Sequence, residues 1–132
     1  MRISTRSRYG LRAMAYLARA GRVCSAKEIS QKEKIPFDFL EKIFSKLQKE
    51  NLVKSQKGAK GGYLLARPPQ KISIGEILRV LEGKEIFSVF CRKKRCLSQK
   101  RCPIRDIWEK IQEVLNSTLE ETTLLDLTKR KI

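Results

Sequence analysis

The stretch IPFDFLEKIFSKLQKENLVKSQKGAKGGYLLA, residues 35–66, decides the fold of this chain. Its apolar residues recur at i, i+3, i+4 and i+7 between Leu40 and Leu47, which predicts a helix from about Phe37 to Glu50 with one apolar stripe. The segments LVKSQ and GYLLA that follow are short and apolar, and they flank the glycine-rich tip KGAKG. This pattern is typical of a hairpin, or wing, placed directly after a helix.

Two further helices are predicted upstream of this stretch. Residues 8–20 place apolar side chains at helical spacing and are followed by Gly21, a common helix terminator. Ser25 stands three residues before Glu28, a capping-box pattern that opens a short helix through about Glu33. An Ile-Pro step separates this helix from the next one, so the pair forms a candidate helix-turn-helix.

Two more helices are predicted on either side of a cysteine-rich loop. Ser73 precedes Glu76 by three residues and caps a helix that ends at Gly83, and Pro103 suits the first turn of a long helix. Apolar residues of the long helix follow near-heptad spacing, which requires a partner helix, so we expect a homodimer interface there. The expected interface residues are Ile104, Ile107, Trp108, Ile111, Val114, Leu115 and Leu119.

The expected fold class is mainly α with a small β wing, because the chain is long enough for one core and too short for two independent domains. Residues 1–82 are predicted to form a winged helix-turn-helix DNA-binding domain. Residues 83–102 are expected to be a cysteine sensor loop, and residues 103–132 a dimerisation helix with a C-terminal tail.

The charge of the chain points to a polyanionic partner. There are 30 Lys and Arg against 14 Asp and Glu, a net charge of +16, and the excess lies within the first 102 residues. No apolar run suits a signal peptide or a membrane span, so we expect a cytoplasmic protein without a membrane partner. Without histidine, paired carboxylates or a nucleotide-binding glycine loop, neither catalysis nor a small-molecule substrate is expected.

The second helix of the pair and the wing carry side chains suited to double-stranded DNA. Residues near the start of a recognition helix reach base edges in the major groove, and wing lysines neutralise phosphate or enter the minor groove. A solvated charged helix face and ordinary turn glycines are the alternatives. The predicted DNA-contacting residues are Arg2, Ser4, Arg8, Tyr9, Ser25, Asp38, Lys42, Ser45, Lys46, Lys57, Lys60, Gly61 and Gly62.

Three segments resemble one known family. RYGLRAMAYLA near the start, the stretch 35–66, and ISIGEILRVLEG before the cysteine loop are similar to the bacterial winged helix-turn-helix regulators that include IscR, NsrR and CymR. GAKGGYLLA followed by ISIGEI is the most specific part, because wing and following helix match together. The resemblance covers nearly the whole chain and implies a homodimeric transcription regulator that presents two recognition helices and two wings to a pseudo-palindromic site.

Cys91, Cys96 and Cys102 form the pattern C-x4-C-x5-C in a loop rich in Arg and Lys. Thiolates are the usual protein ligands of iron-sulphur clusters, whereas a zinc ribbon prefers CxxC pairs. The resemblance implies that these cysteines hold an iron-sulphur cluster, 2Fe-2S in preference to 4Fe-4S, that controls promoter binding. The first gap departs from the family pattern, in which cluster-binding members often have five residues in each gap.

The fourth cluster ligand is a second departure from the family. One branch has a histidine three residues after the last cysteine, where this chain has Arg105, and another has an acidic residue near position 8, where this chain has Arg8. Glu41 matches a glutamate ligand of a similar regulator and is the candidate. The alternative for Glu41 is an ordinary solvent-facing helix residue, and water, a small thiol or a group of the partner chain are the other candidates for the fourth ligand.

Other functions remain open at this level. Cationic neighbours would lower the pKa of free loop thiols, which suits a cluster-free redox or sulphur-metabolism regulator of the same fold. A small iron-sulphur electron carrier leaves the wing and the charge unexplained, and an RNA-binding protein would show more than 7% aromatic residues for base stacking. Cys24 stands apart from the other cysteines and is expected to be a small, semi-buried apolar residue.

Overall fold

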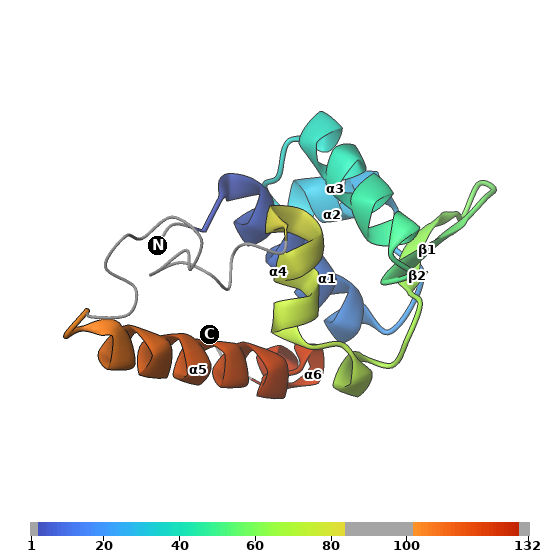
Figure 1. Cartoon of the computed structure of the whole chain (residues 1–132). Helices are drawn as coiled ribbons and strands as arrows, with labels where there is room; N and C mark the ends of the chain where they lie inside the picture. Colours follow the sequence, from blue (N-terminus) through green and yellow to red (C-terminus); the bar gives the residue numbers. More distant parts are fainter. Residues whose placement is uncertain (1–2, 84–101, 130–132) are drawn as a thin grey trace.

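The computed structural model describes residues 3–83 and 102–129 of the chain. It is mainly helical with a two-stranded antiparallel wing, so the expected fold class is confirmed (Figure 1). The helices within these two ranges are too short or too polar to span a bilayer. The elements are α1 (Thr5–Ala20), α2 (Ala26–Glu33), α3 (Phe37–Lys49), β1 (Val53–Gln56), β2 (Gly62–Leu65), the 3-10 helix η1 (Pro69–Lys71), α4 (Ile74–Glu82), α5 (Arg105–Glu121) and α6 (Leu124–Thr128).

Hydroxyl caps set where the first helices begin. The Ser4 hydroxyl accepts a hydrogen bond from the Ser7 backbone N–H, so α1 starts at Thr5, earlier than its apolar spacing predicts. Ser25 and Ser73 cap α2 and α4 in the same way, as their sequence patterns predict. The Glu28 carboxylate, expected to complete a capping box at Ser25, instead accepts hydrogen bonds from side chains of α1 and the following loop.

The wing follows α3 through a tight turn at Asn51, whose φ of 59° is left-handed. Its two strands pair antiparallel, from Val53 opposite Leu65 to Gln56 opposite Gly62. The loop between α1 and α2 adds a third pairing, because Cys24 forms an antiparallel bridge with Tyr63 of β2. The wing is therefore joined to the helix-turn-helix through its second strand as well as through α3.

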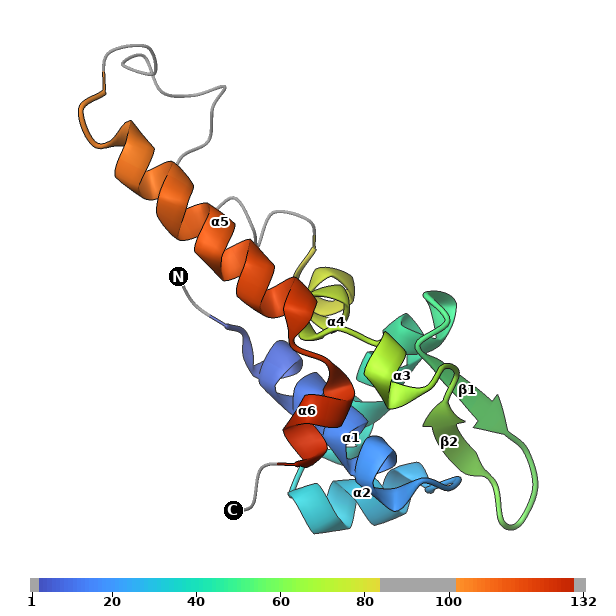
Figure 2. The same ribbon diagram turned by 90° about the horizontal axis from the view of Figure 1, so that it is seen from below.

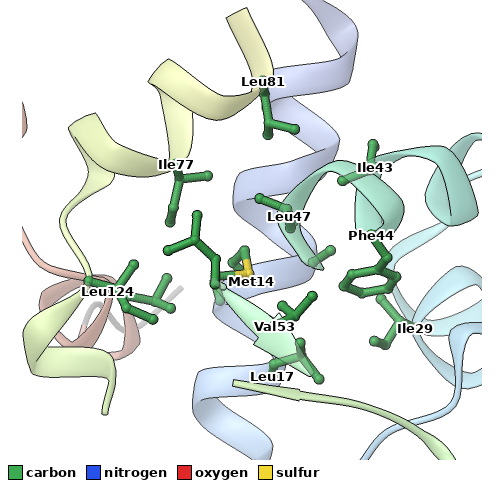
Figure 3. Close-up of a cluster of buried hydrophobic side chains, with 14 of the residues drawn as sticks. Met14, Leu17, Ile29, Ile43, Phe44, Leu47, Val53, Ile77, Leu81 and Leu124 are labelled. Carbon is green, nitrogen blue, oxygen red and sulfur yellow. The ribbon is translucent and has the colours of Figure 1, made fainter. Parts of the chain in front are cut away.

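One core lies between α1, α3, α4 and the base of the wing (Figure 3). Met14 and Leu17 of α1, Phe44 of α3 and Ile77 of α4 all belong to it, and each is at most 1% exposed. Gly10 permits α1 and α4 to approach closely, because a Cβ there would collide with the side chain of Leu81. These contacts fix the recognition helix against the rest of the fold.

The carboxy-terminal helices leave the core and return to it. Helix α5 begins at Arg105, two residues after Pro103, and projects away from the other helices in Figure 2. Its far end packs on α4, where the Arg79 guanidinium pairs with the Glu120 carboxylate. Helix α6 lies in the segment expected to be a tail, and its Leu124 is fully buried in the core. The end of the described chain is thus part of the same packed unit as α1.

Candidate nucleic-acid interface and cysteine loop

Helix α3 presents one buried and one exposed face. Leu40 and Leu47 are completely buried against the core. The helix is amphipathic because its apolar residues recur every three or four positions, so the charged side chains between them are left in solvent. The exposed face carries all the α3 residues predicted to meet DNA, together with the candidate cluster ligand: Asp38, Glu41, Lys42, Ser45 and Lys46.

The tip of the wing carries two exposed lysines, Lys57 and Lys60. The wing begins next to α3 and projects outward from the helices (Figure 1). The Gln48 amide of α3 donates to the Ser55 hydroxyl of β1 at 3.2 Å, which joins the helix to the hairpin. Gly61 was expected to allow close approach to a groove, and the structure adds an internal reason for it. A Cβ at Gly61 would collide with the backbone carbonyl of Gln56, so the turn itself requires glycine there.

The predicted contacts at the start of α1 are partly occupied by internal bonds. The Ser4 backbone N–H donates to the Glu82 carboxylate at 2.7 Å. Burial raises the pKa of Glu82, but hydrogen bonds from Ser4 and Ser7 outweigh it and hold the pKa below its ordinary value. Glu82 therefore binds the amino end of α1 as a carboxylate. Arg8 is exposed, and Arg2 lies outside the described residues.

Two aromatic side chains at the start of α3 were absent from the sequence prediction. Phe37 is 43% exposed and Phe39 is 36% exposed, both on the leading turn of the recognition helix. Phe39 also makes an edge contact with Tyr9, with ring centroids 5.4 Å apart. Phe37 stands three residues before the buried Leu40, and Phe39 stands four residues before the buried Ile43. Apolar spacing alone therefore places both in the core stripe, and their exposure is found only in the structure.

Cys102 is half-buried immediately before α5, and its backbone carbonyl accepts a hydrogen bond from the Arg105 N–H at 3.3 Å. Cys91 and Cys96 lie outside the described residues. Arg105, at the position where some relatives have a histidine, forms an ion pair with Glu109 at 2.9 Å. The donor set, three thiols without histidine, has the chemistry of an iron-sulphur site.

The outer part of α5 exposes a stripe of apolar side chains. Ile104, Ile107 and Val114 are 48%, 53% and 57% exposed, and no residue of this helix is fully buried within the chain. Leu119 differs from the other expected interface residues, because it packs against the core of its own chain. The apolar stripe that needs a partner therefore lies toward the amino-terminal end of α5.

A protein-family model described as "Rrf2: Iron-dependent Transcriptional regulator" matches residues 3–130. The chain belongs to the Rrf2 family. This confirms the resemblance seen in the sequence.

Several Rrf2 regulators are similar to the whole chain. CymR of Bacillus subtilis is 39% identical over 96% of this chain and 89% of the relative, and IscR of Yersinia pseudotuberculosis is 32% identical over 96% and 79%. The solved structure of CymR (YrzC), the global cysteine regulator of B. subtilis, matches with a TM-score of 0.86 at 36% identity, covering 100% of this chain and 99% of that one. The T. potens IscR structure matches with a TM-score of 0.78 at 34% identity, covering 98% and 87%.

Membership in the Rrf2 family assigns transcription regulation, and with it DNA binding, to this chain. The relatives are transcriptional regulators rather than enzymes. The family match extends across the wing, the cysteine loop and α5, so all three are parts of an Rrf2 regulator. The family description names iron, whereas the B. subtilis CymR structure is described as a cysteine regulator, so the control of DNA binding in this chain is left to be proposed.

Proposed function

We propose that this Rrf2 protein binds promoter DNA as a homodimer, and that an iron-sulphur cluster held by Cys91, Cys96 and Cys102 controls the binding. The family description "iron-dependent" and the three loop thiols support this function. The observation that carries it is the position of Cys102 three residues before α5, the helix with the exposed apolar stripe, where its carbonyl accepts a hydrogen bond from the Arg105 N–H.

DNA binding follows from the exposed face of α3 and the wing. Helix α3 enters the major groove with Asp38, Lys42, Ser45 and Lys46 toward base edges and phosphates. Lys57 and Lys60 of the wing bind phosphate beside it or enter the adjoining minor groove.

The homodimer forms through α5. Exposed apolar side chains on one face of a projecting helix are costly in water, and pairing with the same stripe of a second copy removes them from it. A two-fold axis between the helices would present two α3 helices and two wings to the two halves of a palindromic site. The oligomeric state therefore determines affinity, since one copy reads only half the site.

The cysteine loop connects two elements that bear on DNA binding. It begins after Glu82, which holds the start of α1, and it ends at Cys102, three residues before α5. Bound there, a cluster would supply an iron centre whose integrity depends on iron supply and oxidants. Cys91, Cys96 and Cys102 would hold the cluster, with Glu41 as the proposed fourth ligand, and its binding would shift the population of dimer arrangements.

A cluster-free thiol regulator is the second candidate. The similarity to CymR favours it, since that structure is described as the global cysteine regulator. A Staphylococcus aureus CymR structure, described as an oxidized form, also matches, with a TM-score of 0.78 at 34% identity. In this alternative the loop thiols themselves are the redox-sensitive groups, and no metal is needed.

Anaerobic purification followed by a visible absorption spectrum and iron and sulphide analysis separates the two candidates. The cluster proposal expects a coloured protein with iron and sulphide, and loss of both in Cys96→Ala. Cys24→Ala is the matched control, because it removes a completely buried thiol that belongs to the loop between α1 and α2 and not to the segment 91–102. A colourless, iron-free parent protein would support the thiol regulator in place of the cluster.

Binding to duplex DNA is tested separately from the cofactor. Affinity for a promoter duplex and for single strands of the same sequence is measured over a series of salt concentrations. The regulator keeps its sequence preference when salt weakens the phosphate contacts, whereas a general RNA-binding or electron-carrier protein does not.

A further inference from the structure

The loop between α1 and α2 is paired with the wing. The Cys24 backbone N–H donates to the Tyr63 carbonyl at 2.9 Å, and the Tyr63 N–H donates to the Cys24 carbonyl at 2.8 Å. Gly62 is required for this approach, since a Cβ there would collide with the Cys24 carbonyl. The Tyr63 ring stacks on Phe44 of α3, with centroids 4.3 Å apart and planes 17° apart. Residues 22–25 thus support the strand that packs directly on the recognition helix.

A cluster of three side chains holds this loop in place. The Glu28 carboxylate of α2 accepts hydrogen bonds from both terminal nitrogens of Arg22, at 3.1 and 2.8 Å. It also accepts a hydrogen bond from the Tyr16 hydroxyl of α1 at 2.5 Å. The Arg22 Nη1 lies 3.4 Å from the Cys24 Sγ, so the guanidinium spans the loop on which Cys24 lies. We call Tyr16, Arg22 and Glu28 the wing clasp.

At neutral pH the wing clasp contains an ionised carboxylate that accepts hydrogen bonds from the other two side chains. Hydrogen bonds from Arg22, and then from Tyr16, lower the pKa of Glu28 to about 2, so its carboxylate is ionised. Burial raises the pKa of the Cys24 thiol, which stays protonated and completely enclosed. The loop is therefore held by a bidentate charged pair and a tyrosine, with an uncharged thiol beneath them.

A hairpin of two four-residue strands is marginal by itself and takes its orientation from what packs against it. We propose that the wing clasp is a positioning device that sets the angle of the wing to α3, and so places Lys57 and Lys60 against the DNA backbone. The inference rests on the DNA contacts proposed for the wing. Ion pairs this exposed contribute little to overall stability, so the clasp acts on the geometry of the wing and not on whether the chain folds.

The first test needs no DNA. Backbone amide exchange is measured for Cys24 and Tyr63 in the full-length parent and in Glu28→Ala. The clasp predicts exchange at least about tenfold faster at both amides in the variant, because their pairing opens locally. Glu33→Ala is the matched control, since Glu33 also lies on α2 and pairs with Arg12 of α1 at 3.6 Å, but it is at the opposite end of the helix from the loop. Unchanged exchange in Glu28→Ala, or equal acceleration in Glu33→Ala, would overturn the proposal.

The second test measures duplex binding over a salt series for the parent, Glu28→Ala, the double variant Lys57→Ala/Lys60→Ala, and all three changes combined. Each lost phosphate contact reduces the slope of log affinity against log salt by about 0.9. We expect Glu28→Ala to reduce the slope by between about one and two, and the lysine changes to reduce it little further in that background. Full additivity of the two effects would show that the clasp does not act through the wing.

The lysine variants separate this inference from the proposed function. If the double lysine variant binds as the parent does, the proposed wing contact fails, while the exchange result still decides whether the clasp orders the wing. Tyr16→Phe is a milder variant that removes one hydroxyl and keeps the core packing. It is expected to accelerate exchange at Cys24 and Tyr63 in the same direction as Glu28→Ala, with an unchanged thermal midpoint.

Discussion

Replacing Leu124 with alanine tests how the end of the chain is joined to the winged helix-turn-helix. Leu124 is 0% exposed, and its backbone N–H donates to the Ile72 carbonyl at 2.8 Å. Replacing a fully buried leucine by alanine costs about 2–5 kcal/mol. Because the backbone bond is kept and a five-residue helix can shift to fill part of the cavity, we expect a loss of about 2–3 kcal/mol.

The loss is measured by urea unfolding at a fixed protein concentration, because association of two copies contributes to the apparent stability. A fall of about 10 °C in the thermal midpoint should accompany it. Leu125→Ala is the control, since Leu125 lies on the same helix and is only half-buried. A loss below about 1 kcal/mol, or equal losses in the two variants, would refute the assignment of α6 to the core.

Three further predictions concern the dimer, the wing and the acid response. Ile107→Glu places a charge in the apolar stripe of α5, where Ile107 is 53% exposed. Sedimentation should show a monomer, and duplex binding should be at least about tenfold weaker. The control Glu113→Ala changes an exposed residue of the same helix and should remain dimeric. Gly62→Ala should weaken duplex binding, because its Cβ would push Cys24 off β2; binding equal to that of the parent would contradict the close approach. The pKa of Glu28 is lowered from 4.5 to about 2, so its contribution to stability is complete above pH 4.5 and is lost as the pH falls through about 2. Because an ion pair this exposed contributes little to overall stability, the expected change is local. Protection of the Cys24 and Tyr63 amides, measured relative to their intrinsic exchange rates, should fall as the pH falls through about 2 in the parent but not in Glu28→Ala, and identical protection profiles would count against the pairing.

Local signals in the sequence were sufficient for most of the winged helix-turn-helix. Serine caps, the spacing from Leu40 to Leu47 and the glycine-rich wing tip act within a few residues, so they predict α2, α3, the hairpin and α4 closely. The start of α1 was missed because its cap, Ser4, precedes the apolar pattern.

Contacts between distant residues could not be predicted in the same way. The sequence pattern predicts that the Glu28 carboxylate bonds the backbone N–H of Ser25 in a capping box. Once α1 and α2 pack together, the carboxylate instead accepts hydrogen bonds from the Arg22 guanidinium and the Tyr16 hydroxyl, and a charged donor forms the stronger bond. Cys24 was expected to be semi-buried and is completely buried, because β2 covers it. Leu119 follows the heptad spacing, yet spacing alone does not distinguish a partner helix from the core of the same chain.

The most direct measurement of the proposed function is the affinity of the loaded and cluster-free homodimers for the same promoter duplexes. Both forms are prepared anaerobically and titrated at one salt concentration, because phosphate contacts make affinity depend on salt. Control of binding through Cys91, Cys96 and Cys102 predicts that the dissociation constants differ by at least about tenfold on one or more promoters, which corresponds to about 1.4 kcal/mol. Equal affinity of the two forms for every promoter fragment would contradict it.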